Sequence, residues 1–429
     1  MKKVDAEIKK YCDELGIQAP IFDWVDFMSE ERLVPTLRFV EFKDGWKSKT
    51  LGEISGIYGR IGFRGYTVKD LVSEGEGALT LGGKHINSNN RLDLSEPDYL
   101  SWDKYEESPE IKVSKGDIIT SQRGTLGRSA YIFNDIGKAT INPSMVLLKK
   151  FKEDGIFLYY TLIHQNFIKE VYRRSSSTAV PMISQSELKK ININFPSLNE
   201  QKKIANFLSN VDEKLELLNQ KLNQTTQFKK YLMQNIFSQK LRFNEEEIWK
   251  TVEVSSVVSE YKEKAGDNDY PVLSSTLSGI FLQSDYFDKN VNSSDTQDYK
   301  VVPKGYFTYR SMSDTGIFRF NIQNIIEKGI ISPAYPVFTT RNINKCFLEE
   351  YLNNSPNIKR QILTLKEGGT RYALRFNKFK KLKIDLPSSN EQNKIADCLK
   401  TMNTKIDNAN NELKYLIEFK KGLIQQMFV

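Results

Sequence analysis

The sequence contains an internal repeat at a fixed offset of 191 residues. PSLNEQKKIANFL begins at Pro196 and PSSNEQNKIADCL begins at Pro387, and 18 of the 43 positions in 195–237 are identical to those in 386–428. A repeat of this kind constrains the whole fold, because each copy is expected to form the same structural unit. The chain is therefore expected to contain two related units, each ending in a copy of this segment.

Both copies have the spacing of a long amphipathic helix. Apolar residues alternate every three and four positions over about 40 residues, which is typical of a coiled-coil seam and gives a helix about 60 Å long. An intervening globular segment would return the chain, so the two helices are expected to pair in antiparallel fashion. Lys229 and Lys420 interrupt both seams at the same place. We expect their stems to follow the seam and their ammonium groups to reach water.

The helix starts carry a second pattern. Ser197-x-x-Glu200 and Ser388-x-x-Glu391 follow a proline and have the form of a capping box, in which serine and glutamate satisfy the first backbone N–H groups. Fainter matches precede each helix: Leu37-Arg38-Phe39 comes before Trp46, as Leu241-Arg242-Phe243 comes before Trp249. The segments before the helices are therefore interpreted as divergent copies of one domain.

The expected fold class is α+β. Short β-branched runs broken by Gly, Asn and Ser fill both divergent segments, with one helix expected near Phe157–Tyr172 and another near Phe347–Leu363. Two mixed α/β domains would be separated by two long antiparallel coiled-coil helices with pseudo-two-fold symmetry. The expected divisions are an N-terminal extension over 1–35, with a short helix at Lys3–Leu15, two domains over 36–195 and 242–386, and two helices over 196–241 and 387–429.

Composition excludes several classes of protein. Mean hydropathy is −0.49, and no uncharged apolar run approaches the roughly 20 residues of a membrane helix, so the chain is interpreted as cytoplasmic. Three cysteines and two histidines, all far apart, argue against a disulfide framework and a zinc site. The net charge of +8 permits a polyanionic partner. The two domains carry +4 and +3, and residues 1–35 carry −3.

The layout of variable domain, NEQ-x-K-IA helix, variable domain and second helix resembles the specificity subunit of type I restriction-modification systems. The resemblance covers about residues 33–429 and includes Tyr270-Pro271-Val272-Leu273-Ser274-Ser275-Thr276 and Lys304-Gly305. It implies two target-recognition domains that each read half of a split, asymmetric site in double-stranded DNA. It also implies helices that dock two methyltransferase subunits, to which restriction (motor-nuclease) subunits are added. S-adenosylmethionine, ATP and Mg²⁺ are then expected on the partners, with no cofactor, metal or catalytic site on this chain.

Patterns for catalysis are incomplete in this sequence. The Gly82-Gly83-Lys84 segment lacks the opening glycine and the closing Ser or Thr of a P-loop, and Asn142-Pro143-Ser144 departs from the motif of adenine methyltransferases. The strongest nuclease pattern is Asp98 followed by Glu110-Ile111-Lys112, which could hold Mg²⁺ beside a phosphate. A charged surface beside a turn is the simpler interpretation of that segment.

DNA recognition needs cations for phosphates and guanidinium or amide groups for base edges. Three groups of loop residues recur in both domains: a Gly- or Ser-rich turn, an arginine on a loop, and a basic, hydroxyl-rich loop. A fourth group interleaves Arg, Gly and aromatic residues in the first domain only. The candidate DNA-binding residues are Arg60, Arg64, Lys84, Arg123, Arg128, Arg173, Arg174, Ser274, Thr276, Arg310, Thr370, Arg371 and Tyr372.

Other interpretations remain open on the sequence. His85 is either a base contact or, as base rates favour, a hydrogen-bonded structural histidine. His164 lies in an expected helix and is interpreted as structural. The alternative function is a coiled-coil protein–protein scaffold without nucleic-acid recognition. A fused restriction enzyme is disfavoured by the incomplete motifs.

Overall fold

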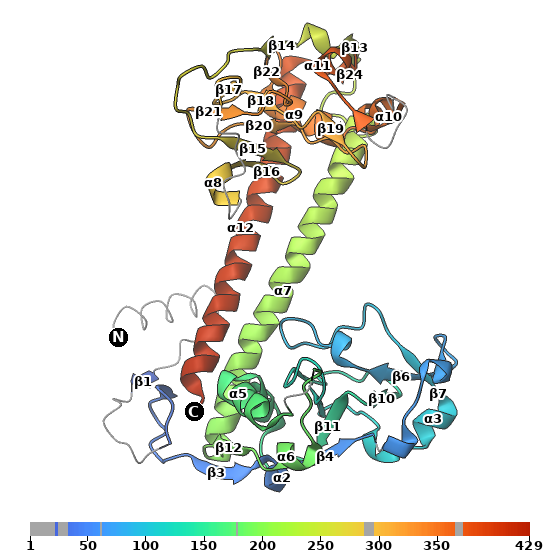
Figure 1. The fold of residues 1–429 in the computed structure, drawn as a ribbon, viewed down its shortest axis with the longest axis vertical. Helices are drawn as coiled ribbons and strands as arrows, with labels where there is room; N and C mark the ends of the chain where they lie inside the picture. Colours follow the sequence, from blue (N-terminus) through green and yellow to red (C-terminus); the bar gives the residue numbers. More distant parts are fainter. Residues whose placement is uncertain (1–21, 25–32, 61, 177–178, 287–295, 365–371) are drawn as a thin grey trace. The chain divides into compact units, whose positions relative to one another are not determined.

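The computed structural model describes residues 22–24, 33–60, 62–176, 179–286, 296–364 and 372–429 (Figure 1). The chain forms two compact units. Unit 1 comprises residues 1–218 and 412–429, and unit 2 comprises residues 219–411. The division between the units therefore passes through both long helices. Each unit contains one α+β domain together with parts of both helices.

The domain of unit 1 is built on two four-stranded sheets. One has the order β10-β6-β7-β5, in which β10 and β6 are parallel, and the other is antiparallel with the order β4-β11-β8-β9. A further pair, β3 with β12, joins the start of the domain to its end. The strands are β2 (Leu37–Phe39), β3 (Lys47–Thr50), β4 (Gly56–Gly59), β5 (Leu71–Val72), β6 (Gly77–Leu81), β7 (Tyr99–Ser101), β8 (Ile118–Ser121), β9 (Ser129–Tyr131), β10 (Ala139–Ile141), β11 (Met145–Lys149) and β12 (Asn192–Phe195).

Part of the N-terminal extension contributes to unit 1. β1 (Phe22–Trp24) pairs with β2 in antiparallel fashion, with Phe22 opposite Phe39. The helix expected at Lys3–Leu15 lies outside the described residues. The shorter helices of unit 1 are α2 (Leu51–Ile54), α3 (Trp102–Glu106), α4 (Gly155–Ile163), α5 (Gln165–Arg174) and α6 (Gln185–Lys189).

Unit 2 repeats this plan, but in its described residues only one sheet has four strands and the others have two. Its largest sheet has the order β14-β22-β18-β20, and β13 pairs with β24 as β3 pairs with β12 in unit 1. The strands are β13 (Lys250–Glu253), β14 (Val258–Tyr261), β15 (Leu273–Thr276), β16 (Gly279–Leu282), β17 (Lys300–Pro303), β18 (Phe307–Thr308), β19 (Met312–Ser313), β20 (Asn321–Ile322), β21 (Lys328–Ile331), β22 (Val337–Thr340), β23 (Tyr372–Ala373) and β24 (Lys383–Leu386). The helices are α8 (Gln283–Tyr286), α9 (Lys345–Asn354), α10 (Pro356–Thr364) and α11 (Phe376–Phe379).

The single helix expected in each domain is divided in two. In unit 1, His164 leaves the helical conformation after α4 and its ring accepts the Asn166 N–H at the start of α5. In unit 2, Ser355 is extended after α9, and Pro356 cannot continue a helix because it lacks the N–H that the ladder requires. Both domains therefore have the same helix–break–helix element.

The two long helices are α7 (Leu198–Phe237) and α12 (Ser389–Met427), close to the expected length (Figure 1). In unit 1, the first half of α7 and the last part of α12 share one apolar core with α4. Phe428 stacks on Phe157 with ring centroids 5.2 Å apart. In unit 2, the end of α7 and the start of α12 share the core of α9. The expected seam positions Leu208, Val211 and Leu399 are fully buried.

The glutamate of each expected capping box has another role. Ser197 and Ser388 do accept the N–H of Glu200 and Glu391. However, both carboxylates turn away from the helix start and form ion pairs with an arginine. The expectation of a reciprocal capping box is therefore wrong for its second half.

Each of these ion pairs is a two-bond arginine–carboxylate contact. Arg38 donates to the two oxygens of Glu200 at 2.7 and 2.8 Å, and Arg242 donates to those of Glu391 at 2.9 Å each. Both carboxylate side chains are 1% exposed. Such paired bonds combine energy with a fixed geometry. We call these two contacts the arginine latches, because each joins the Leu-Arg-Phe segment at the start of a domain to the long helix that follows it.

The neighbouring glutamines add a second connection. Gln201 donates to the carbonyl of Pro196 at 2.9 Å and accepts the backbone N–H of Asp154, the N-cap of α4, at 3.0 Å. Gln392 makes the same two contacts in unit 2, with Pro387 and with Asn344, the N-cap of α9. The Glu-Gln pair of the repeated motif therefore fixes the domain to the helix at two points.

The two seam lysines do not reach water, contrary to the sequence expectation. Their side chains are only 16% and 11% exposed. Lys420 pairs with Asp212 at 2.6 Å, and Asp212 also accepts from Tyr160 and Arg91. A charge held in an apolar seam needs such partners, since a buried unpaired ammonium group is costly.

In unit 2 the seam lysine also has a carboxylate partner, but this carboxylate lies on the domain and not on the long helix. Lys229 donates to Asn403 at 2.5 Å and lies 3.4 Å from Glu350. Asn403 is the repeat equivalent of Asp212, and Glu350 follows the N-cap of α9 by six residues, as Tyr160 follows that of α4. Each lysine thus has one carboxylate, supplied by the helix in unit 1 and by the domain in unit 2. Among the described residues, no helix has the length and apolar character needed to cross a bilayer.

The latch in unit 1 is testable by substitution. Glu200→Ala leaves the buried Arg38 without its partner and is expected to lower the free energy of unfolding by about 3 kcal/mol. Native-state hydrogen exchange of the α4 amides measures this change. Glu41→Ala is the matched control, because the Lys203–Glu41 pair is about half exposed and is expected to contribute less than about 1 kcal/mol. Equal effects of the two substitutions would contradict the assignment.

Candidate nucleic-acid interface

Two of the candidate cations are exposed arginines on corresponding loops. Arg123 follows β8 in unit 1 and Arg310 follows β18 in unit 2, and both side chains are exposed. Within the described part of the chain, neither guanidinium has an ion-pair or hydrogen-bond partner in its own unit. Each is therefore available to a ligand without first breaking an internal contact.

The backbone shows how the two loops correspond. Gln122 accepts the N–H of Ile183, and Ser311 accepts the N–H of Leu374, in the same position at the end of the domain. This alignment places Arg310 opposite Ser121, so the two arginines lie two positions apart on a shared frame. The two loops therefore correspond to each other, but the two arginines do not occupy equivalent positions on them.

Arg60 and Arg64 have internal partners. Arg60 is buried, and its guanidinium reaches Thr140 Oγ1 at 3.2 Å and the Ile141 carbonyl at 3.4 Å. Arg64 lies 3.4 Å from Glu110. The position of Arg60 favours a structural role over a DNA contact, and Arg64 is half-buried.

The Gly82–His85 turn is also held internally. His85 is buried, accepts the N–H of Gly82 at 2.8 Å and contacts the Glu96 carbonyl at 3.2 Å. Burial and the neighbouring Lys84 lower the pKa of His85, so the neutral ring is favoured. His85 is a structural histidine, in agreement with the base-rate expectation. Lys84 pairs with Asp98 at 2.8 Å and remains half exposed.

Contrary to the expectation of a basic loop, Arg173 and Arg174 are the last residues of α5 and form a charge cluster on one carboxylate. Arg173 donates to Glu170 at 2.6 and 2.7 Å, and Arg174 donates to it at 2.6 Å and lies 3.4 Å from Glu187. These hydrogen bonds lower the pKa of Glu170 to about 2. Arg128 donates to the Ile86 carbonyl and so connects its loop to the Gly82–His85 turn.

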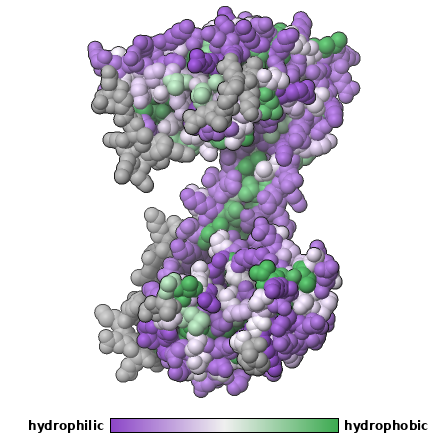
Figure 2. All heavy atoms as spheres, turned by 45° about the vertical axis from the view of Figure 1, so that its right-hand side comes forward, coloured by the Kyte–Doolittle hydropathy of each residue, from purple (hydrophilic) through white to green (hydrophobic). Residues whose placement is uncertain are grey.

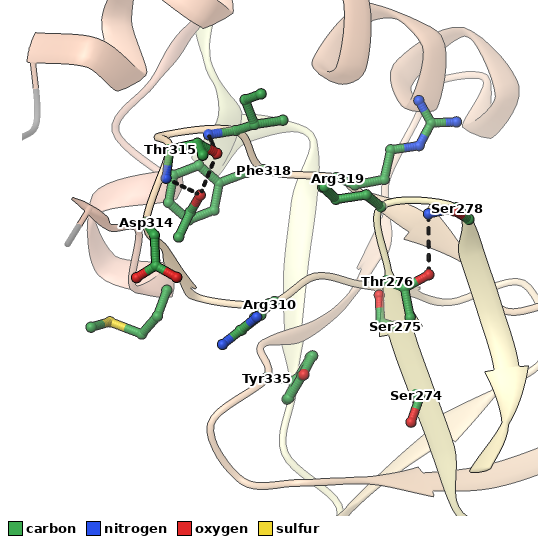
Figure 3. Close-up of a pocket in the computed structure, with 14 residues that line it drawn as sticks. Ser274, Ser275, Thr276, Ser278, Arg310, Asp314, Thr315, Phe318, Arg319 and Tyr335 are labelled. Atoms are coloured by element: carbon green, nitrogen blue, oxygen red, sulfur yellow. Dashed lines mark hydrogen bonds between the residues drawn. The ribbon is translucent and has the colours of Figure 1, made fainter. Parts of the chain in front are cut away.

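In unit 2, three of the candidates border a hollow of about 500 Å³ that is lined by polar and apolar side chains (Figure 3). Ser274 and Thr276 lie on β15 along one side, and Arg310 points into the space between this strand and the 313–318 segment. The Thr276 hydroxyl accepts the N–H of Ser278 and donates to the Gly279 carbonyl, both at 3.1 Å, so it shapes the turn. The structure brings Ser274, Thr276 and Arg310 together around one space.

The last candidate loop is only partly described. Thr370 and Arg371 lie outside the described residues. Tyr372 is half-buried on β23 and packs against Gly316. The φ of +77° at Gly316 favours glycine, and a Cβ at this position would lie 3.2 Å from the tyrosine ring. Tyr372 therefore packs against the 313–318 segment at Gly316.

The nuclease pattern does not converge on one site. Asp98 pairs with Lys84, Glu110 with Arg64, and Lys112 with Glu106. In the described ranges, no three His, Cys, Asp or Glu side chains are grouped as a metal site. The separate pairing favours the interpretation as a charged surface.

Sequence reasoning missed a second hollow in unit 2, of about 480 Å³. It is lined by three cations from distant segments, Lys262, Lys300 and Arg375, and by one carboxylate, Glu260. Burial lowers the pKa of Lys300, which donates to the Tyr335 carbonyl at 2.9 Å. No local motif indicates this cluster, because Lys262 and Arg375 are 113 positions apart in the chain.

The sequence matches a known protein family over most of its length. Residues 43–227 and 247–418 match the family described as type I restriction modification DNA specificity domain. The chain belongs to this family. It is 24% identical over 351 residues to the type I restriction enzyme MjaVIII specificity subunit of Methanocaldococcus jannaschii, covering 73% of this chain and 79% of that subunit. The putative MjaX specificity subunit of the same organism is 23% identical over 438 residues, covering 93% and 96%.

Solved structures from type I systems share the fold. The S subunit of the type I system from M. genitalium covers 92% of this chain and 99% of its own, with a TM-score of 0.58 at 16% identity. A second chain, from a study of complex assembly and conformational transition of a type I system, has a TM-score of 0.51 at 14% identity. The two-domain layout with mixed helix and sheet agrees with the α+β expectation.

The Glu170 cluster gives a pH-dependent prediction. Because its folded pKa of about 2 lies below the usual 4.5, the contribution of Glu170 to stability is present above pH 4.5 and is lost as pH falls towards 2. Arg173→Gln is expected to raise the pKa of Glu170 towards 4.5, measured by carboxylate NMR titration. Lys189→Gln removes an exposed cation from the same unit and serves as the control. An unchanged Glu170 titration in Arg173→Gln would contradict the contact.

Proposed function

We propose that this chain is the sequence-reading subunit of a type I restriction-modification complex. Unit 1 would read one half of a split, asymmetric site in double-stranded DNA, and unit 2 would read the other. The observation that carries the proposal is the pair of exposed arginines, Arg123 and Arg310, on equivalent loops of two divergent domains. An exposed guanidinium on a loop suits guanine, which it contacts through two hydrogen bonds.

The proposal assigns the two long helices to spacing and assembly. An antiparallel coiled coil with pseudo-two-fold symmetry would hold one recognition domain at each end. Its outer surface would dock two methyltransferase subunits, and restriction subunits would join them. Apolar side chains reach the surface of the helical segment (Figure 2). In unit 2, Phe228 and Tyr231 of α7 are 49% and 59% exposed.

The proposal places the chemistry on the partner subunits. They would carry S-adenosylmethionine, ATP and Mg²⁺, and this chain would act without a catalytic site or cofactor of its own. The separate pairing of Asp98, Glu110 and Lys112 supports this assignment.

Exchange of one domain tests the division of the site. Replacement of residues 36–195 by the equivalent domain of another specificity subunit is expected to change one half of the methylated motif and to leave the other half intact. Genome-wide mapping of N6-methyladenine, in cells that express the hybrid with its methyltransferase, measures both halves at once.

The reciprocal hybrid, with residues 242–386 replaced, is the matched control and is expected to alter the opposite half. A change in both halves, or in neither, would overturn the assignment of one half-site to each unit.

The length of the helices is expected to set the unread spacer. Two domains on one face of DNA read positions about one helical turn apart, roughly 34–36 Å. A seven-residue insertion in each helix, near Thr225 and near Ile406, preserves the apolar spacing and adds about 10 Å. The spacer is then expected to lengthen by about three base pairs, with both half-sites unchanged.

Methylation mapping reports the spacer directly. Insertion into α7 alone is the control, and because it shifts one seam against the other it is expected to reduce assembly. A full-activity double insertion with the original spacer would rule out the helices as the ruler.

A further inference from the structure

The two hollows of unit 2 differ in chemistry. The first, which we call the reading hollow, contains Arg310, hydroxyl groups of β15 and of the 313–318 segment, and exposed apolar side chains at Leu277 and Ile317 (Figure 3). The second, which we call the cationic hollow, contains Lys262, Lys300 and Arg375. One is a mixed polar and apolar surface, and the other is dominated by positive charge.

A fixed wall separates the two hollows. Ser311 donates to the Ala334 carbonyl at 2.7 Å and accepts the Leu374 N–H at 2.8 Å. β19 pairs with β23, and Met312 lines both hollows. Arg310 therefore lies in the hollow on one side of this wall, and Arg375 lies in the hollow on the other side.

Arg310 is the cation of the reading hollow that points into it. Arg319 also lines this hollow, but its guanidinium turns away from Arg310 (Figure 3). Burial raises the pKa of Glu349, and the charge of Arg319 opposes this rise. Leu277 and Ile317 are 63% and 61% exposed. Apolar side chains suit base edges such as the thymine methyl group and gain nothing from the charged phosphate backbone.

Arg375 and Lys262 suit the backbone. Lys262 is 74% exposed, and its contact with Glu260 at 3.1 Å is an exposed ion pair of small energy that a phosphate can replace. The described side chains of unit 2 offer Arg375 no ion pair, and it marks the start of α11. Three cations against one carboxylate leave this hollow positive.

We propose that the two hollows divide the work of recognition in the half-site of unit 2: Arg310 reads a guanine, and Lys262 and Arg375 bind DNA phosphates without regard to sequence. This inference rests on the proposed function and adds to it the role of each cation. Base contacts specify and phosphate contacts position, so the two classes differ in a measurable way.

The test uses the full chain in complex with its methyltransferase. The motif is first established by N6-methyladenine mapping with the wild-type chain, and a wild type without any motif would refute the proposed function itself. Duplexes with the motif, and with each single base pair changed in the unit 2 half, are then titrated at several salt concentrations.

Arg310→Lys keeps the charge and removes the paired hydrogen bonds. It is expected to lower discrimination at one G·C position by roughly tenfold or more and to leave the salt dependence unchanged. Arg375→Gln is expected to weaken binding to all duplexes by a similar factor and to reduce the slope of log affinity against log salt by about 1. Its methylated motif is expected to stay the same.

Arg360→Gln is the matched control, because Arg360 is an exposed cation of unit 2 that borders neither hollow. It is expected to change neither discrimination nor salt slope. Intact discrimination in Arg310→Lys, an altered motif in Arg375→Gln, or an effect of Arg360→Gln equal to that of Arg375→Gln would each overturn the division of roles while the wild-type motif stands.

Discussion

The arginine latches are the contacts on which the arrangement of each unit depends. A loop cation is useful for recognition only when its domain is held rigidly, and the domain joins its long helix through a buried arginine–carboxylate pair and a glutamine that meets the N-cap of α4 or α9. Burial of such a pair costs desolvation free energy, and the pair fixes the orientation of the domain on its helix. The same contacts in both units explain why the Glu-Gln pair survives in both copies while the surrounding loops have diverged.

The elements that repeat by period were predictable from sequence. The length of α7 and α12 and the burial of Leu208, Val211 and Leu399 follow from apolar spacing, because periodicity is a local property of the chain. The break at Pro356 could have been found from proline alone. The partners of Glu200 and Glu391 could not be found from spacing, although both latch arginines stand in the repeated Leu-Arg-Phe segment.

The candidate site was predicted less completely, for a physical reason. Composition identifies cations, but their availability depends on carboxylates that are distant in sequence, as Glu110 is from Arg64 and Asp98 is from Lys84. Only the fold shows that Arg60 is buried whereas Arg123 and Arg310 are exposed. The cationic hollow could not be found from local patterns, because its three cations come from the residue that follows β14, from β17 and from the start of α11.

The two seam lysines bear on how such chains exchange parts during evolution. Lys420 has its carboxylate on the helix, at Asp212, and Lys229 has its carboxylate on the domain, at Glu350. A recombination event that moved only the domain of unit 2 into unit 1 would set two carboxylates around one lysine, and the reverse event would leave a lysine with none. Crossovers that include the helix position together with its domain keep the charges balanced. Recombinants that move a domain from one unit to the other are therefore expected to join within the long helices, beyond these positions, whereas exchange between equivalent units keeps the charges balanced at either junction.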